Sequence, residues 1–519
     1  MKKIIITIFI VLGFTSCEKF LKETPKDQIS SSQYFKTKAD AEATVNILYY
    51  NGVPTFYNDA GFEGTSMMMS GYMSGLFDNG RKERPGPIEA QHLTLDPVNV
   101  NAYMHKWWQS CYQAISRSNI AIKYIPEIGA LSESDANKLL AEARFFRALN
   151  YFYLVKIFGD VPLITEPSEN LDNIYVKRDP DEKVYDQITT DLNWALDNGG
   201  LADVLFSSNG NRITQGVVSA LLADAYLQMA GYPVQAEGSY AKAAEVARMI
   251  INSGKYELIK NGNTPTESAY NKMRTSQNQS EYIYFLECNA DLRTNNLTKY
   301  TIPTNAAPPG TKTGDFPWNG YRPLDEYVSI YDPDKDLRMK NNQLFYNKIE
   351  KNSIVYEFNE WAPYLWYDET AIYSTGRGSM NIGMYRYAEV LLIAAEAIVQ
   401  TKGVNNEAVT YLADVRSRGY WQTDRNQIEL ELAGLSDEQF IKEVWKERYR
   451  ELALDYKTWP DIQRTRKYPV VSSPGVVEFV DVIGHTNPWG ATFKESNMLF
   501  PISEMDIQRN PALVPNPGY

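Results

Sequence analysis

The chain has 519 residues and a net charge of −12, with 44% hydrophobic and 22% charged residues. Its length exceeds what one hydrophobic core usually serves, so we expect several subdomains or a repeat architecture in a globular protein. The acidic balance argues against binding of nucleic acid, which depends on basic patches.

The first 17 residues have the layout of an export signal. They read MKKIIITIFIVLGFTSC, with a positive start, an apolar run at 4–12, and small residues before Cys17. This run is too short to span a bilayer, which takes roughly 20 residues, and it is typical of a secretory signal.

Bacterial lipoproteins are cleaved and acylated at a Cys in this place, although Phe14 stands where Leu is usual. We predict a lipoprotein signal peptide at 1–16, lipidation of Cys17 and a polar tether at 17–37. The alternative is an ordinary signal peptide cut near Ser16, with Cys17 incidental.

Beyond the tether, apolar residues recur at intervals of three and four, which predicts helices. Gly or Pro bounds several of these segments. The expected helices are 39–50, 98–122, 133–158, 183–196, 215–230, 240–253, 385–401, 406–418 and 436–454.

Several of these helices form antiparallel pairs with short links. The segments 213–233 and 239–259 carry small residues at the positions where tetratricopeptide helices approach each other, and 385–403 with 405–419 repeats the plan. Stacked pairs of this kind share a continuous core. The helix at 133–158 is apolar nearly all round, so neighbours must bury it on several sides.

Between the two sets of pairs the helical rhythm disappears. The region at about 256–384 is rich in proline, glycine and aromatic residues, which predicts loops that pack on the helices or line a site. We therefore expect a single unit at 38–519, with helical repeats at about 38–255 and 385–465. The rest, 466–519, is expected to be an extended tail.

Two charged patterns favour a structural interpretation. The segment 442–465 alternates glutamates with lysines and arginines, which is typical of a helix with intrahelical ion pairs. Arg144 and Arg147 lie on one helix face and are expected to pair with carboxylates.

Four blocks of this sequence resemble the SusD/RagB family of Bacteroidetes outer-membrane nutrient-binding lipoproteins. The resemblance covers the whole chain after the signal. The blocks are CEKFLKETPKDQISSSQYFKTKADAEATVNILY (17–49), LLAEARFFRALNYFYLVKIFGDVPLITEP (139–167), YRYAEVLLIAAEA (385–397) with LADVRSRG and KEVWKERYRELALDYKTWPDIQRT, and LFPISEMDIQRNPALVPNPGY (499–519).

The resemblance implies a mostly α fold, with about four tetratricopeptide-like pairs and a variable, loop-rich half that carries the ligand site. It also implies a partner, a SusC-like TonB-dependent barrel in the outer membrane, over which the lipoprotein sits as a lid. The location implied is the cell outer membrane, with the protein lipid-anchored and surface-exposed.

Motifs for catalysis, cofactors or metals are not found in the sequence. There is no Gly-x-Ser-x-Gly elbow, His-Glu-x-x-His pair or phosphate-cradling glycine loop. The three histidines fit no ligand spacing, and the run Asp332, Asp334 and Asp336 fails as a calcium loop because Leu337 stands where Gly is needed. We interpret that run as a turn with capping carboxylates. We expect no enzyme activity, no cofactor and no metal.

Cys111 and Cys288 are expected to be small buried hydrophobes, with a single disulfide as the alternative.

A glycan site needs flat aromatic faces for the C–H face of a sugar ring and polar side chains for its hydroxyls. The loop at 59–86 and the segments 316–327 and 358–370 hold such residues. The candidates are Tyr72, Phe77, Asp78, Asn79, Arg81, Trp318, Tyr321, Trp361, Tyr364 and Trp366.

We expect an oligosaccharide-binding protein of the cell surface that delivers its ligand to the SusC-like transporter. A peptide ligand is the first alternative, and it would be favoured by a charged, Asn-rich cleft without exposed flat rings. An exported glycan-degrading hydrolase is the second, since Glu360, Asp368 and Glu369 lie among tryptophans.

Overall fold

The computed structural model describes most of the chain after the predicted tether. The predicted signal peptide, Cys17 and most of the tether lie outside the described residues. The described ranges are 34–54, 67–80, 85–168, 174–276, 280–303, 307–312 and 320–519.

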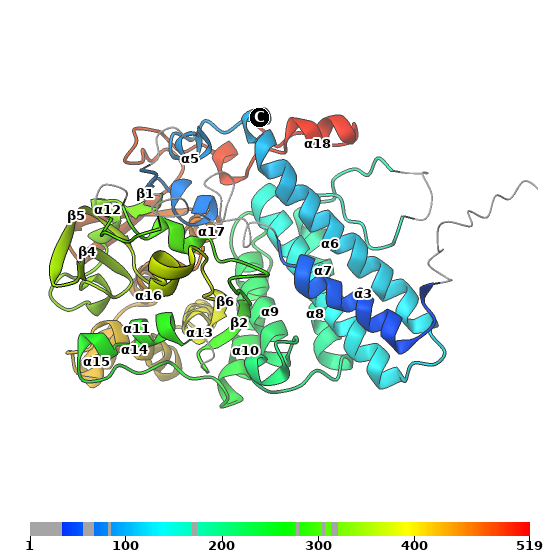
Figure 1. Ribbon diagram of the computed structural model, residues 1–519, viewed down its shortest axis with the longest axis horizontal. Coiled ribbons are helices and arrows are strands. Elements are labelled where there is room, and N and C mark those ends of the chain that lie inside the picture. The colour runs from blue at the N-terminus through cyan, green and yellow to red at the C-terminus, as the bar shows by residue number, and fades with distance from the viewer. Residues whose placement is uncertain are drawn as a thin grey trace, which may run out of the picture.

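One half of the molecule consists of long helices packed side by side, drawn in blue and cyan in Figure 1. The helix α7 is buried along most of its length because α6 and α8 pack against it from different sides, and α3 lies against α6 and α7. Side-chain caps begin two of these helices, at Thr37 for α3 and Ser132 for α7. The four helices are α3 (Lys38–Asn51), α6 (Met104–Tyr124), α7 (Glu133–Phe158) and α8 (Asp181–Asn198).

Helix pairs continue the layer toward the centre of the molecule. α9 packs on α8 and on its own partner α10, and α10 then packs on α13, which pairs with α14. This chain of neighbours confirms the predicted mostly α, tetratricopeptide-like scaffold. The helices are α9 (Gln215–Ala230), α10 (Ser239–Asn252), α13 (Tyr387–Lys402) and α14 (Asn406–Gly419).

The predicted helix ends agree closely with the structure, and the differences have local causes. The expected helix at 98–122 begins only at Met104, because Asn99–Ala102 forms a separate 3-10 turn. The last long predicted helix ends at Glu451. That last long helix is α16 (Asp437–Glu451). The periodicity did not predict the shorter helices α5 (Pro85–Gln91), α11 (Ala269–Thr275), α12 (Asp325–Val328), α15 (Arg425–Ala433), α17 (Thr458–Thr465) and α18 (Glu504–Arg509).

The strands of the described residues form two-stranded antiparallel sheets. The β4–β5 hairpin turns at Asn352 and Ser353, which both have positive φ as a tight hairpin turn requires. This hairpin forms the far end of the loop-rich half (Figure 1). The pairs are β1 (Phe77–Asp78) with β3 (Arg322–Pro323), β2 (Tyr282–Leu286) with β6 (Ile382–Arg386), β4 (Phe345–Lys351) with β5 (Ile354–Pro363), and β7 (Lys467–Ser473) with β8 (Val476–Asp481).

The sequence predicts an extended tail from residue 466, and this prediction is wrong for most of the segment. The segment contains the β7–β8 hairpin and α18. Only the end of the chain lies extended against the helices. There the Asn516 side-chain amide donates to the backbone carbonyls of Phe158 and Phe500, at 3.0 and 2.8 Å.

The charged residues of α16 (Asp437–Glu451) form ion pairs mainly with residues of other elements. Glu447 and Glu451 are fully buried and accept from Arg338, Arg416 and other arginines of neighbouring segments. The prediction of intrahelical ion pairs holds for Lys446 with Glu443 but is wrong for the buried glutamates. The reason is that this face of the helix points into the molecule, where arginines from other elements meet it.

Two further structural interpretations are confirmed. Arg144 and Arg147 both pair with Asp191 of α8. Cys111 and Cys288 are separate, buried thiols, and burial raises the pKa of each to about 12. None of the helices in the described ranges is both long and apolar enough to cross a membrane.

Candidate functional site

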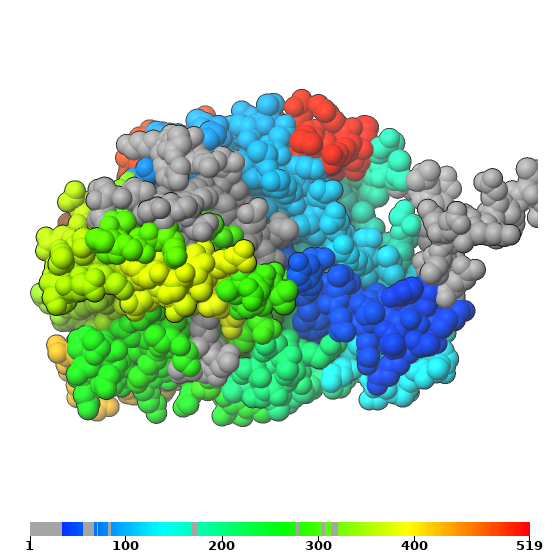
Figure 2. Space-filling model, viewed as in Figure 1, coloured from blue at the N-terminus to red at the C-terminus, as the bar shows by residue number. Residues whose placement is uncertain are grey.

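A cavity of about 370 Å³ lies between the β1–β3 pair and the β4–β5 hairpin. It opens in the loop-rich half of the molecule, where β4 and β5 form one end of the face shown in Figure 2. Its lining residues are Asp78, Arg322, Pro323, Leu324, Asp325, Glu326, Asn347, Phe358, Asn359, Glu360 and Trp361.

Arg322 organises the cavity. The short antiparallel pairing of β1 with β3 places it opposite Asp78, and its guanidinium forms ion pairs with Asp78 and with Glu360 of β5. The side chains of Arg322 and Asp78 are 14% and 13% exposed, and that of Glu360 is 29% exposed. The three groups therefore fix the relative positions of two separate strand pairs while their polar atoms stay at the edge of the cavity.

Trp361 gives the cavity its one large half-exposed ring among the described lining residues. It lies on β5 next to Glu360, and Asn359 and Asn347 supply amide groups beside it. The site thus combines an aromatic surface with carboxylates, a guanidinium and amides. Such groups suit a ligand with many hydroxyls or amides.

Phe77 and Tyr321, which precede the lining residues Asp78 and Arg322 in the chain, belong to a stack of rings that the sequence predicts as glycan-binding. Phe77 stacks on Tyr321 with centroids 4.4 Å apart, and Tyr321 also contacts Tyr72 and Trp366. Tyr72, Phe77 and Tyr321 have no exposed surface, and Trp366 is 7% exposed. Their interpretation as exposed sugar platforms is therefore corrected, because neighbouring rings cover their faces.

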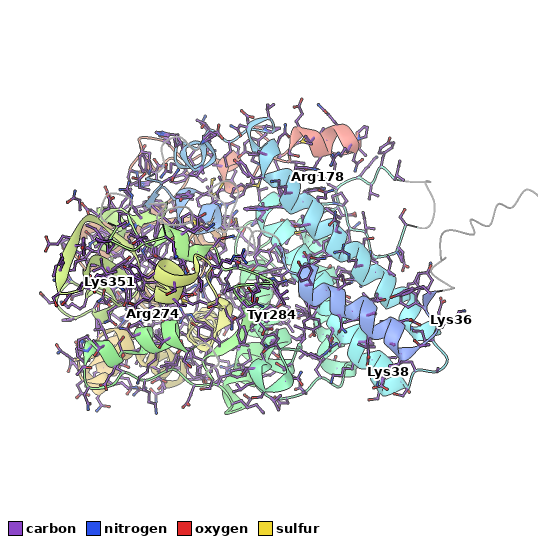
Figure 3. All side chains as sticks on the ribbon, viewed as in Figure 1. Lys36, Lys38, Arg178, Arg274, Tyr284 and Lys351 are labelled. Carbon is purple, nitrogen blue, oxygen red and sulfur yellow. The ribbon has the colours of Figure 1, made fainter. Side chains whose placement is uncertain are left out.

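The remaining candidates are divided between the site, the interior and the parts that are not described. Asn79 is buried at 1% exposure. Tyr364 is half-buried in a second aromatic cluster, where it stacks on Tyr367 at 5.2 Å and Arg274 lies over its ring. Figure 3 labels Arg274 in this half of the molecule. Arg81 and Trp318 lie outside the described residues.

Of the predicted site residues, the structure brings Asp78 and Trp361 to one cavity. It adds Arg322, Asn347 and Asn359, which the sequence analysis did not name. Arg322 and Asn359 stand inside the segments 316–327 and 358–370 that were singled out for their aromatics. Their charge and amide groups, adjacent to those rings, were the available signal.

The carboxylates considered for hydrolysis have other partners. Glu360 pairs with Arg322, and Asp368 accepts from the backbone amides of Ala371 and Ser379 at 3.0 and 3.2 Å. Glu369 lies 3.3 Å from the amine of Lys351. These contacts join the three carboxylates to other groups of the chain itself.

The aspartate run also has a local structural role. Asp332 accepts from the amides of Asp334 and Lys335, and Asp336 caps the short helix that follows it. These hydrogen bonds confirm the predicted turn with capping carboxylates. No cluster suited to a metal ion occurs within the described ranges.

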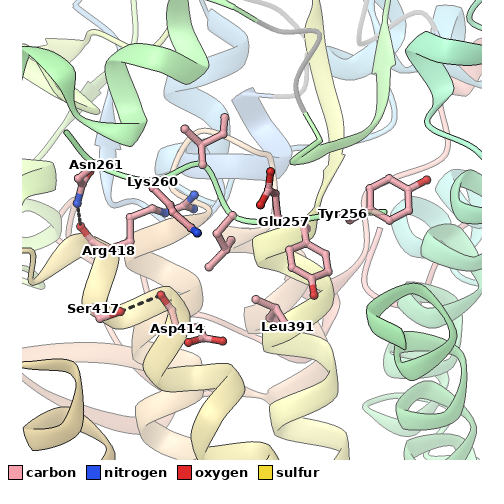
Figure 4. Close-up of a pocket in the computed structure, with 11 residues that line it drawn as sticks. Tyr256, Glu257, Lys260, Asn261, Leu391, Asp414, Ser417 and Arg418 are labelled. Carbon is pink, nitrogen blue, oxygen red and sulfur yellow. Dashed lines mark hydrogen bonds between the residues drawn. The ribbon is translucent and has the colours of Figure 1, made fainter. Parts of the chain in front are cut away.

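A different hollow, of about 410 Å³, lies between the segment 256–261 and helices α13 and α14 (Figure 4). Several of its polar groups bind other parts of the chain. Asn261 donates to the Arg418 carbonyl, Asp414 pairs with Arg425, and the Arg418 guanidinium binds Glu281 and Glu451.

Sequence models of SusD-type families match both the N-terminal and the C-terminal part of the chain. Residues 340–519 match the sequence model of the SusD family, and residues 20–227 match one described as "Starch-binding associating with outer membrane". SusD-like protein P2 of Formosa agariphila is 26% identical over 540 residues, which cover 100% of both chains.

Solved structures give the same result for the fold. A SusD superfamily protein from Parabacteroides distasonis superposes with a TM-score of 0.80 and 29% identity, over 93% of this chain and 99% of that one. Surface glycan-binding protein A from Bacteroides thetaiotaomicron, solved with laminarihexaose, gives a TM-score of 0.72 at 17% identity, over 92% and 99%. The second likeness concerns the fold alone.

Proposed function

The chain belongs to the SusD/RagB family, and from this premise we propose that it captures oligosaccharide at the cell surface in the cavity around Arg322 and Trp361. The observation that carries the proposal is the meeting of a half-exposed indole with Arg322, Asp78 and Glu360 in one cavity. A sugar ring would place its C–H face on Trp361 and its hydroxyls toward the charged and amide groups.

The expected strength of binding fits capture and release. A stacked aromatic adds about 0.5–1.5 kcal/mol beyond the burial of its area, so one ring with a few hydrogen bonds gives millimolar to micromolar affinity. Weak binding is sufficient when the ligand passes directly to a transporter held nearby. We propose a SusC-like TonB-dependent barrel as that transporter, with this protein as a lid that Cys17 anchors in the outer membrane.

Affinity gels and calorimetry with a polysaccharide panel test the site. Trp361→Ala should weaken binding of the recognised glycan by at least about tenfold, since it removes the stacking surface. Trp318→Ala tests the predicted platform outside the described residues. Trp421→Ala is the matched control, because Trp421 is also half-buried but lies beyond α14. Equal binding by the Trp361 variant and the control would refute the site.

A peptide ligand is the second candidate, and the composition of the cavity favours it in one respect. Asp78, Asp325, Glu326 and Glu360 outnumber Arg322, and two asparagines lie among them. Such a cavity suits a basic peptide. A peptide panel measured beside the glycans separates the two, since binding of peptides but no glycan would replace the first proposal.

We propose binding without catalysis. Glu360 and Glu369 are held in ion pairs and Asp368 accepts from backbone amides, which supports this view. Pure protein should release no reducing ends from a bound glycan. Release that disappears in a Glu360→Gln variant would overturn this part of the proposal.

A further inference from the structure

A separate cavity of about 210 Å³ lies where the C-terminal ends of α7 and α9 meet α17 and the end of the chain. It shares no residue with the cavity around Arg322. Its surface is mainly apolar, with walls from Val155, Pro233, Met498, Leu499 and Pro517.

Lys156 of α7 lines this cavity and is 7% exposed. Its ammonium group has no hydrogen bond or ion pair within the described residues, and lies 4.4 Å from the ring centroid of Phe152 and 5.6 Å from that of Tyr153. A buried ammonium without an acceptor is costly, so its presence needs an explanation.

Asp224, the buried acid that raises the pKa of Lys156 most, does not supply that acceptor. Asp224 of α9 is bound by Lys457 at 3.2 Å, by the Tyr385 hydroxyl at 3.0 Å and by the Gln228 amide at 3.3 Å. Lys457 also pairs with Glu389 at 2.8 Å. The neighbouring buried cation is therefore well paired, whereas Lys156 is not.

A second polar group of the cavity also lacks a hydrogen-bond partner among the described residues. The Tyr185 side chain lines the cavity and is 5% exposed, and its hydroxyl has no hydrogen-bond partner in the described part of the chain. The cavity therefore contains two hydrogen-bond donors without acceptors in the described ranges, an ammonium and a phenol, among apolar walls. These groups match a ligand that has one acceptor group and an apolar body.

We propose that this cavity binds a carboxylate carried on a small apolar group, with the carboxylate on Lys156 and Tyr185. The source is either a free acid or the C-terminal residue of a polypeptide. Asp181, Glu495 and Arg466 also line the cavity, and Arg466 forms an ion pair with Glu495. Burial lowers the pKa of Lys156 to about 8, so the group is mainly cationic at pH 7.

Calorimetry at pH 7 on the full folded protein tests the proposal with phenylacetate, N-acetylleucine and N-acetylleucine amide. Phenylacetate represents a free acid and N-acetylleucine a chain end. We expect 1:1 binding of one or both acids. The uncharged amide should bind at least about tenfold more weakly, because an ammonium makes a stronger hydrogen bond to a carboxylate than to a neutral amide.

Two variants and a control locate the binding. Lys156→Met keeps the length of the side chain and should lower acid affinity by at least about tenfold, and Tyr185→Phe should lower it by a smaller factor. Lys177→Met removes an exposed lysine and should change nothing. Three results would each overturn the proposal. They are equal affinity for acid and amide, unchanged acid affinity in Lys156→Met, and no binding of either acid at tens of millimolar.

Discussion

Lys156 lies near charged groups from several packed elements: Asp224 of α9, Glu389 of α13, and Lys457 and Asp461 at α17. Burial is the largest influence on its pKa and lowers it, while Asp224 and the other acids raise it and Lys457 lowers it further. Three acids therefore do not restore the pKa of this lysine to its ordinary value. At the residue scale, the protonated Lys156 side chain therefore lowers the free energy of unfolding.

Lys156→Met should accordingly stabilise the protein. The folded-state pKa of about 8 lies below the ordinary 10.5, so the unfolded chain binds more protons between these values. The free-energy cost of the buried charge is full below pH 8 and fades as pH rises toward 10.5. Its removal should add roughly 3 kcal/mol to the free energy of unfolding at pH 7.

Guanidinium unfolding of wild type and Lys156→Met at pH 7 and pH 10 measures this effect. The difference between them should shrink at pH 10, and the exposed-site variant Lys177→Met should match wild type at both pH values. A difference that is independent of pH would contradict the assigned protonation.

At the scale of elements, an aromatic stack lies beside the strands that carry Asp78 and Arg322 of the proposed site. Gly71 lies against this stack, and a Cβ there would come within 2.5 Å of Phe77 Cγ and 2.6 Å of the Tyr321 hydroxyl oxygen. Real side chains do not tolerate such distances, so the rings would have to move. Because Phe77 precedes Asp78 on β1, which pairs with β3, we expect Asp78 and Arg322 at the cavity to move with it.

Gly71→Ala should therefore weaken glycan binding and lower stability together, the latter by about 1–3 kcal/mol as for other overpacked cores. Thermal unfolding and the affinity gel report the two effects. Gly129→Ala is the control, since nothing lies within 4 Å of a Cβ at that position. Unchanged affinity and melting temperature in the Gly71 variant would show that the stack does not shape the cavity.

The sequence predicted the long helices well because their periodicity is strong. The bounds of α7 and α9 agree with the expectation, since an apolar helix that ends at a glycine leaves little ambiguity. Short elements such as α17 and the β7–β8 hairpin were not predicted, because their position depends on contacts with distant segments.

The site was predicted by region better than by residue. Trp361 and Tyr321 look alike in sequence, each a large ring beside polar residues, yet one is half-exposed and the other fully buried. Only the packing of Phe77 and Tyr72 on Tyr321 decides this. Arg322 was not predicted because its partners Asp78 and Glu360 are far from it in sequence.

At the scale of the whole molecule, the stacked helices and the loop-rich half have separate tasks in the proposed function. The helices form a continuous scaffold from α3 to α16 (Figure 1), and the loop-rich half holds the cavity around Arg322. A site built on one end of a stiff scaffold moves as a unit when the scaffold swings. Such a lid needs an attachment that keeps it near its transporter without restricting the swing.

Cys17→Ala tests that attachment. Two or more acyl chains hold a protein stably on a membrane whereas one does not, so loss of the acylated Cys should release the protein from the outer-membrane fraction. Glycan affinity and melting temperature should match wild type, because Cys17 belongs to the predicted tether and is not among the residues that line the cavity. Cys111→Ala is the control, since it removes a buried thiol of α6 and should leave the protein on the membrane. Cys17→Ala protein that still fractionates with the outer membrane would contradict lipidation at this residue, whatever its glycan affinity.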